Sequence, residues 1–178
     1  MNTWKEFVGT LEERLRAIKY DSPIYSINFE NLPWLVEYWG DRWPYKTVIA
    51  DESTKLKGYR GSYRTHPVSG KVFLVGAGGA RARALGTVTH TGKIKRFIEL
   101  TGTPAPNGLK DLWGQLWFLD SGERLGRTFE GFATRWFSSR RDGPKVTYSP
   151  TKSADVEIHE RVKDICLTVR AKDYFDIK

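Results

Sequence analysis

The sequence contains a single cysteine, no long apolar run and, over one internal stretch, no acidic residue. With Cys166 as the only cysteine among 178 residues, an intrachain disulfide and a multi-cysteine metal site are both excluded. No apolar run reaches the ~20 residues that a membrane-spanning helix needs. The first residues also lack the apolar segment of a secretory signal. We therefore expect a cytoplasmic protein that makes no membrane contact.

Acidic residues are absent from positions 53 to 98, where the chain carries ten Lys and Arg residues. The remaining positions hold 19 basic and 21 acidic residues, so this one stretch accounts for the net charge of +8. A solvated surface could be kept soluble equally well by mixed charges. An uncompensated basic stretch therefore favours a polyanionic partner.

Apolar periodicity predicts alternating helices and strands. One amphipathic helix is expected to carry Trp4, Phe7, Val8, Leu11, Leu15 and Ile18 behind a capping box of Thr3 and Glu6. Strands are expected at 24–27, 46–50 and 94–100, and helices at 32–39, 79–88, from about 109, at 129–137 and around Ile158, Val162 and Ile165. Loops are expected after Gly58 and over 127–148. This alternation predicts an α/β fold with a mainly parallel sheet flanked by helices.

Two short segments follow predicted strands, at the sheet edge where parallel α/β folds bind ligands. Asp51 and Glu52 come directly after Val48-Ile49-Ala50. One carboxylate of such a pair can hold Mg²⁺ while the other orients an attacking water. An ordinary turn or helix start is the alternative interpretation of this dipeptide.

The second segment is Thr101-Gly102-Thr103-Pro104, which follows Leu100 and precedes a predicted helix. Its hydroxyls and its glycine can approach a phosphate or the carboxylates of the first segment. A β-turn built from common turn residues is the alternative.

Together the two segments resemble motifs II and III of superfamily 2 helicases, and Leu100–Trp113 is most similar to the Swi2/Snf2 branch. Residues 27–31 resemble motif Ib of that family, and residues 129–137 and 162–177 resemble its later conserved segments. The similarity covers about residues 24–178 and is closest to phage and bacterial Snf2-like proteins. The chain differs at Thr54, where the family often has histidine.

The resemblance implies the C-terminal part of a first RecA-like lobe, of the P-loop NTPase type. Residues 1–126 would form the partial lobe, and 127–178 an aromatic, basic extension with the closing helix. Asp51 would hold Mg²⁺ through water, Glu52 would polarise the attacking water, and residues Thr101, Gly102, Thr103 and Pro104 would link nucleotide state to DNA contacts. The implied nucleic-acid-binding residues are Asn28, Lys55, Lys57, Arg60, Arg64, Arg81, Arg83 and Asn107.

The chain lacks the phosphate loop Gly-x-x-x-x-Gly-Lys-[Ser/Thr] on which such a motor depends. The nearest string runs from Gly86 to Ile94, but it has five residues between the glycines and Ile94 in place of the hydroxyl residue. The second lobe is also missing. We therefore expect ATP and Mg²⁺ to serve the complete motor and neither to bind tightly to this chain alone.

The expected partners are DNA, the missing N-terminal segment and the second RecA-like lobe. The chain could be a piece of a larger protein or a split or decayed gene product. The alternative function is that of a non-catalytic helicase-lobe mimic, possible for a phage-encoded protein, that binds a host complex such as a helicase or nuclease.

Overall fold

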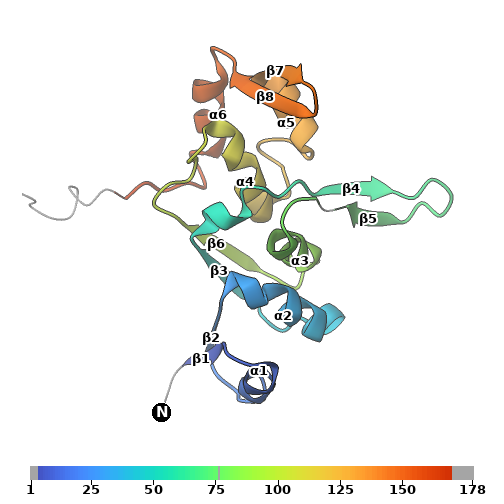
Figure 1. Ribbon diagram of the computed structural model, residues 1–178, viewed down its shortest axis with the longest axis vertical. Helices are drawn as coiled ribbons and strands as arrows, with labels where there is room; N and C mark the ends of the chain where they lie inside the picture. The colour runs from blue at the N-terminus through green and yellow to red at the C-terminus, as the bar shows by residue number, and fades with distance from the viewer. Residues whose placement is uncertain (1–3, 76, 170–178) are drawn as a thin grey trace, which may run out of the picture.

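The computed structural model describes residues 4–75 and 77–169 and has a mixed α/β architecture (Figure 1). Two parallel strand pairs lie in its lower half. In the first, β1 (Trp4–Phe7) pairs with β2 (Ile24–Ile27), and in the second, β3 (Thr47–Asp51) pairs with β6 (Arg96–Leu100). Two antiparallel hairpins complete the strands, β4 (Ser62–Thr65) with β5 (Val72–Val75) and β7 (Phe137–Asp142) with β8 (Lys145–Pro150).

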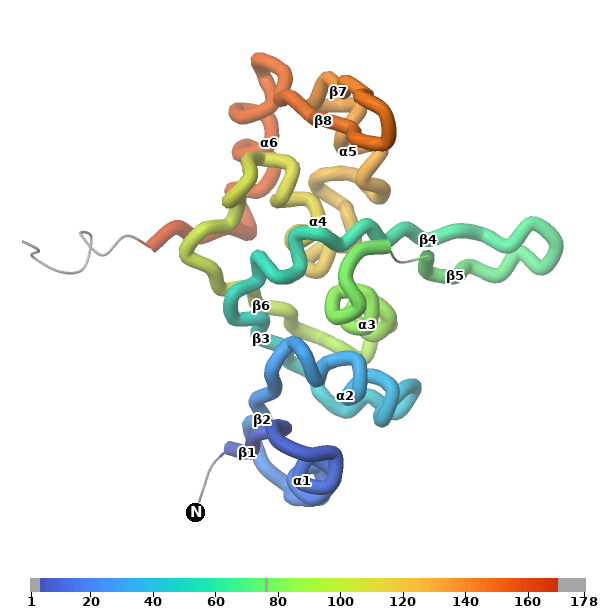
Figure 2. Tube along the Cα trace, in the orientation of Figure 1, coloured from blue at the N-terminus to red at the C-terminus, as the bar shows by residue number. Residues whose placement is uncertain are grey.

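Helices alternate with the strands along the chain, as the chain trace shows (Figure 2). The α-helices are α1 (Leu11–Ala17), α2 (Leu32–Trp39), α3 (Ala80–Thr89), α4 (Leu112–Asp120), α5 (Phe129–Trp136) and α6 (Ala154–Val162). Single 3-10 turns cover Phe29–Asn31, Gly40–Arg42, Ser53–Leu56 and Leu109–Asp111. No helix in the described ranges is long and apolar enough to cross a bilayer.

The core is centred on α4, whose apolar residues extend around the helix and are therefore buried on several sides. Trp113, Trp117 and Phe118 are each at most 1% exposed. The ring of Tyr59 lies 4.7 Å from Trp117 and 4.8 Å from Phe118, measured between ring centroids. Tyr59 belongs to the segment that follows β3, so the same aromatic cluster holds the chain beyond Asp51 and Glu52 against α4.

The β3–β6 pair has one covered and one open face. Phe97 on β6 stacks on Phe118 of α4 with 5.7 Å between ring centroids, which assigns this face to α4. On the alternate positions, Ile49 is 60% exposed and Leu100 is 49% exposed. Parallel sheets are usually covered on both faces. Among the described residues, none forms the layer that normally covers this face of a parallel sheet.

The structure corrects the sequence prediction for the first eighteen residues. Trp4–Phe7 is a strand, because it pairs in parallel with β2 and Phe7 stacks on Tyr25 with 5.1 Å between centroids. Gly9, with a φ of 78°, separates this strand from α1. The capping box is formed by Thr10 and Glu13, whereas the predicted cap residue Thr3 lies outside the described residues.

Other predictions fare differently. The helix at 32–39 and the strand at 24–27 are confirmed with both bounds. The helices predicted at 79–88 and 129–137 are confirmed as α3 and α5, with bounds that differ by one residue at the ends. The two segments predicted as loops contain the β4–β5 and β7–β8 hairpins. The last helix ends at Val162, so Ile165 lies beyond it. Parallel pairing is present, but the described strands form separate two-stranded sheets where one larger sheet was predicted.

Candidate functional site

Asp51 and Glu52 lie exposed where β3 ends. The backbone N–H of Glu52 donates to Asp51 Oδ1 at 3.1 Å. Glu52 has a φ of 56°, in the left-handed region that costs a residue with a side chain roughly 1–2 kcal/mol. Such strain persists only where the surrounding structure imposes it, and it is concentrated at functional sites. The two carboxylates are therefore presented by a fixed, strained turn.

Ser53, the next residue, connects this turn to α4. Its Oγ donates to Gln115 Oε1 at 3.0 Å, and both side chains are buried. Gln115 Nε2 in turn donates to the carbonyl oxygens of Pro104 at 2.6 Å and Asp111 at 3.0 Å. One buried amide therefore joins the segment after β3 to the segment after β6.

Asp111 holds the end of the second segment. Its Oδ2 accepts hydrogen bonds from the backbone N–H and the side-chain Nδ2 of Asn107, both at 3.0 Å. Lys57 Nζ lies 3.5 Å from the same oxygen, and Asp111 is only 5% exposed. Asn107 and Lys57, both predicted to contact nucleic acid, are thus engaged with a buried carboxylate at the start of α4.

The segment from Thr101 to Pro104 forms a local turn. The backbone N–H of Thr103 donates to Thr101 Oγ1 at 3.2 Å. Thr101 is half-buried, whereas Gly102, Thr103 and Pro104 are exposed. The segment therefore presents its exposed backbone and hydroxyl to solvent while its last carbonyl is anchored to Gln115.

A cavity of about 1250 Å³ lies beside β3 and reaches the β1–β2 pair. Four of the predicted site residues line it, namely Asn28, Asp51, Glu52 and Lys55, whereas residues 101–104 and Asn107 do not. Mg²⁺ is usually held by one or two carboxylates together with substrate phosphates. Asp51 fits the part of a single carboxylate ligand, and no group of three or more His, Cys, Asp and Glu side chains occurs among the described residues.

The predicted basic residues divide into engaged and unpaired ones. Arg60 is turned inward: its NH1 donates to the carbonyls of Lys57 and Tyr59, and its guanidinium lies 3.8 Å from the Phe129 ring centroid. Burial lowers the pKa of this guanidinium. Arg81 NH2 pairs with Glu30 at 3.0 Å. Arg64 and Arg83 are exposed and make no ion pair with any described residue.

Sequence reasoning missed Glu99, the carboxylate of β6 that lies next to Ala50 in the strand register. Burial raises its pKa to about 9, opposed by a hydrogen bond with Ser53. Its Oε1 has no hydrogen-bond partner among the described residues. The one signal in the sequence was an acidic residue inside the otherwise apolar run Phe97-Ile98-Glu99-Leu100.

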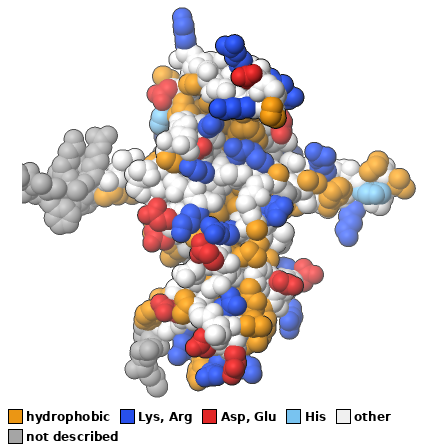
Figure 3. Space-filling model, in the orientation of Figure 1, with side chains coloured by type: hydrophobic (Ala, Val, Ile, Leu, Met, Phe, Trp, Pro, Cys, Tyr) orange, Lys and Arg blue, Asp and Glu red, His pale blue; other side chains and the backbone are white. Residues whose placement is uncertain are grey.

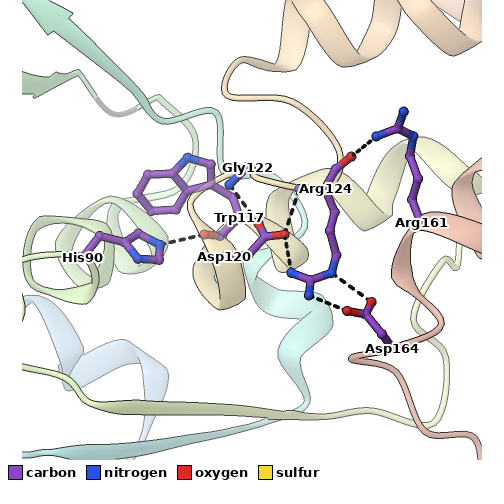
Figure 4. A network of polar contacts seen from close by, with 7 residues as sticks. All are labelled: His90, Trp117, Asp120, Gly122, Arg124, Arg161 and Asp164. Carbon is purple, nitrogen blue, oxygen red and sulfur yellow. Dashed lines mark hydrogen bonds and ion pairs between the residues drawn. The ribbon is translucent and has the colours of Figure 1, made fainter.

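A second polar network fastens Asp164, which follows α6, to the end of α4 (Figure 4). Arg124 donates from Nε to Asp164 Oδ1 at 2.9 Å and from NH2 to Asp164 Oδ2 at 2.6 Å. Its NH1 also donates to Asp120 Oδ2 at 3.2 Å, at the C-terminal end of α4. This network positions α6 and the residues after it but contributes no side chain to the cavity.

Comparison with known proteins finds a phage protein that is similar to this chain. Protein p41 of Acyrthosiphon pisum secondary endosymbiont phage 1 is 41% identical over 174 residues, which cover 96% of this chain. The chain spans only 34% of the length of that relative. No protein-family model matches the chain, and no solved structure is found to be similar.

Proposed function

We propose that this chain is the back part of the first RecA-like lobe of a Swi2/Snf2-like DNA-dependent ATPase. The observation that carries the proposal is the buried link from Ser53 through Gln115 to Pro104. In a motor of this class the carboxylate segment must be connected mechanically to the segment that relays nucleotide state to DNA. Gln115 supplies such a connection between the segment that contains Asp51 and Glu52 and the one that contains Thr101 to Pro104.

The open sheet face supports the view that this chain works within a larger protein. Ile49 and Leu100 are more exposed than sheet residues of a finished α/β domain, and the phage relative extends well beyond the part that this chain matches. Additional polypeptide would cover this face and bring the phosphate loop that the sequence lacks. The cavity beside Asp51 is the natural place for the two parts to meet.

In the complete motor Asp51 would hold Mg²⁺ and Glu52 would orient the water that attacks the nucleotide. Mg²⁺ would neutralise charge on the phosphates when it is bound. The left-handed backbone at Glu52 sets the point from which its side chain leaves the chain. The chain alone supplies no phosphate-binding loop, so we expect it to show no ATPase activity by itself.

The experiment is an ATPase assay on the full-length protein that contains this chain, with and without DNA. We expect DNA-stimulated hydrolysis, and Glu52→Gln should lower kcat by about 10²–10⁴-fold. Glu160→Gln, which changes an exposed carboxylate on α6, serves as the matched control. Full activity in the Glu52→Gln protein would overturn the assignment.

The basic stretch is proposed to contact the DNA backbone, so binding should be independent of sequence and sensitive to salt. Within the part of the chain that the structure describes, Lys55, Arg64 and Arg83 are the exposed cations of the predicted set that make no ion pair, and Lys55 lies over the ring of Phe29. An affinity for oligonucleotides that is unchanged between low and moderate salt would contradict this. Stoichiometric capture of a host protein without nucleic acid would instead favour the helicase-lobe mimic.

A further inference from the structure

The β4–β5 hairpin projects from the body as an arm, which we define as residues 60–75 and Ala77 (Figures 1 and 2). Its base is fixed by paired hydrogen bonds, from Arg60 N to Ala77 O at 2.9 Å and from Ala77 N to Arg60 O at 3.3 Å. Its tip is closed by His66, whose backbone N–H donates to Lys71 O at 2.8 Å and whose Nδ1 accepts from Ser69 N at 3.2 Å. The arm is therefore a preformed ribbon.

The strand register assigns the side chains of the arm to two faces. Tyr63 and Leu74 are directly opposite each other, and the Tyr63 ring lies 6.2 Å from Trp117, with the ring planes only 29° apart. This pairing places their face against the body of the protein. Because neighbouring positions alternate, Arg64 and its partner Phe73 lie on the other face.

The face that carries Phe73 combines an aromatic ring with cations. Arg64 is directly opposite Phe73, and Lys71 lies two positions from Phe73 toward the tip on the same face. Phe73 is 42% exposed, and Arg64 and Lys71 are exposed with no ion pair among the described residues. The space-filling view shows hydrophobic, basic and histidine side chains gathered on this projection (Figure 3).

Apolar exposure continues around the tip. Val68 is 89% exposed and Val72 is 60% exposed. In addition, no acidic residue occurs from position 53 to 98. Cations alone would suffice for the phosphates of an intact duplex, whose base faces are stacked and hidden. An exposed aromatic ring between cations suits a partner that offers both phosphates and free base faces.

We propose that the arm binds single-stranded nucleic acid, with an unpaired base stacked on Phe73 and phosphates held by Arg64 and Lys71. This inference rests on the proposed DNA-dependent function and assigns it a preferred substrate, namely unpaired strands or the junction where a duplex opens. Arg60, which is turned inward against Phe129, anchors the arm and does not take part in binding.

The test measures the affinity of the chain for a fluorescently labelled oligo-dT strand, and for a labelled duplex of equal length, by fluorescence anisotropy. Phe73→Ala should weaken binding to the single strand by about 5- to 150-fold, the range expected for the loss of one stacked base, and leave duplex affinity unchanged. Phe73→Tyr should retain binding. Val72→Ala, on the opposite face of the same arm, is the matched control.

The charged pair has its own control on the other hairpin. The double variant Arg64→Gln, Lys71→Gln should bind both the single strand and the duplex more weakly. For the single strand, the slope of log affinity against log salt concentration should become shallower by about 0.7 per charge removed. The double variant Arg140→Gln, Arg141→Gln on β7 should change neither the affinity nor its salt dependence. The fluorescence of a base analogue such as 2-aminopurine in the single strand should be quenched by the unaltered protein and not by Phe73→Ala. Unchanged duplex affinity of Phe73→Ala distinguishes this lost stacking from misfolding.

The outcomes separate the two proposals. If Phe73→Ala binds the single strand as well as the unaltered protein does, while the charge variant binds weakly, the arm holds phosphates only and the stacking proposal is overturned with DNA binding intact. If the unaltered chain binds no oligonucleotide, the DNA-binding function itself fails. A host protein captured through Phe73 in the absence of oligonucleotide binding would likewise overturn the assignment of a nucleic-acid partner.

Discussion

Ser53 and Gln115 are 62 positions apart in the sequence, yet their buried side chains share a hydrogen bond of 3.0 Å. Gln115 also bonds the carbonyls of Pro104 and Asp111 through the same amide group. A displacement of the turn at Asp51 and Glu52 that keeps these hydrogen bonds would move α4, the segment before it, or both. The relationship gives the candidate site a route for passing a change at one strand end to the other.

Removal of the amide should destabilise the fold. Gln115→Ala would leave the Pro104 and Asp111 carbonyls without this donor, and we expect the free energy of unfolding to fall by about 1–3 kcal/mol. Urea denaturation measures the change. Ser138→Ala, which removes an exposed hydroxyl whose Oγ donates to Ser149 O at 3.3 Å, should change it by less than about 0.5 kcal/mol. Equal effects of both substitutions would contradict a special role for Gln115.

Tyr59 should make α3 intolerant of a side chain at Gly86. A Cβ at this position would lie 2.4 Å from Tyr59 Oη, so Gly86→Ala should lower the free energy of unfolding by about 1–3 kcal/mol through overpacking. Tyr59→Phe removes the nearest clashing atom and should partly rescue the variant. Since Tyr59 Oη has no hydrogen-bond partner among the described residues, Tyr59→Phe alone should cost little.

The matched control for the Gly86 substitution is Thr87→Ala, at an exposed position of the same helix. Thermal or urea unfolding measures the stability of Gly86→Ala, Tyr59→Phe, the double variant and Thr87→Ala relative to the unaltered protein. Additive effects of Gly86→Ala and Tyr59→Phe, with no rescue in the double variant, would show that the penalty at Gly86 does not come from the Tyr59 hydroxyl.

Glu99 should make stability decline with rising pH. Its pKa is raised by burial from the ordinary value of 4.5 to about 9, so between these values the unfolded chain ionises while the folded carboxyl stays protonated. The folded state then binds more protons than the unfolded state, and the free energy of unfolding falls by up to about 1.4 kcal/mol per pH unit. The contribution is fully present below the unfolded pKa and is lost as pH rises toward the folded one.

Glu99→Gln abolishes this titration without changing the size of the side chain. Its stability relative to the unaltered protein should therefore increase steadily as pH rises from 4.5 to about 9. Urea midpoints across that range measure the difference, with Glu160→Gln as the exposed control. Parallel pH profiles for Glu99→Gln and the unaltered protein would contradict a neutral buried carboxyl.

Asp164 should behave in the opposite sense. The hydrogen bonds from Arg124 hold its pKa below the ordinary value, so its contribution to stability is present above that value and is lost as pH falls through the folded pKa. Asp164→Asn should lower stability at neutral pH and match the unaltered protein in acid. Because Asp164 is exposed, added salt should shrink the difference. Asp155→Asn, on the solvent side of α6, is the control, and a penalty for Asp164→Asn that persists in acid would contradict the ion pair.

Local sequence signals predicted some elements well and others not at all. The helix at 32–39 was predictable because Pro33 occupies its first turn and Gly40 its end. The segment from Trp4 to Ile18 was predicted wrongly because its apolar spacing fits a helix, whereas pairing of Trp4–Phe7 with β2 is a non-local event. The hairpin arm was missed because both of its faces are partly exposed, which removes the alternation that normally signals a strand.

The candidate site divides in the same way. The placement of Asp51 and Glu52 at a strand end followed from the apolar run before them, and the structure has them there. The left-handed conformation of Glu52 had no signal, because glycine or asparagine usually marks it. The connection through Gln115 could not be predicted either, because a glutamine on an otherwise apolar helix does not indicate which distant loop it will contact.

The paired hydrogen bonds between Arg60 and Ala77 have an evolutionary consequence. The chain leaves the body and returns to it at the same place, so the length and composition of the segment between these residues can change by insertion or deletion without disturbing β3 or β6. Such a module can be exchanged while Asp51 and Thr101 keep their places at the ends of β3 and β6. Relatives that differ in this segment would keep the arrangement of β3 and β6 and present a different surface on the arm.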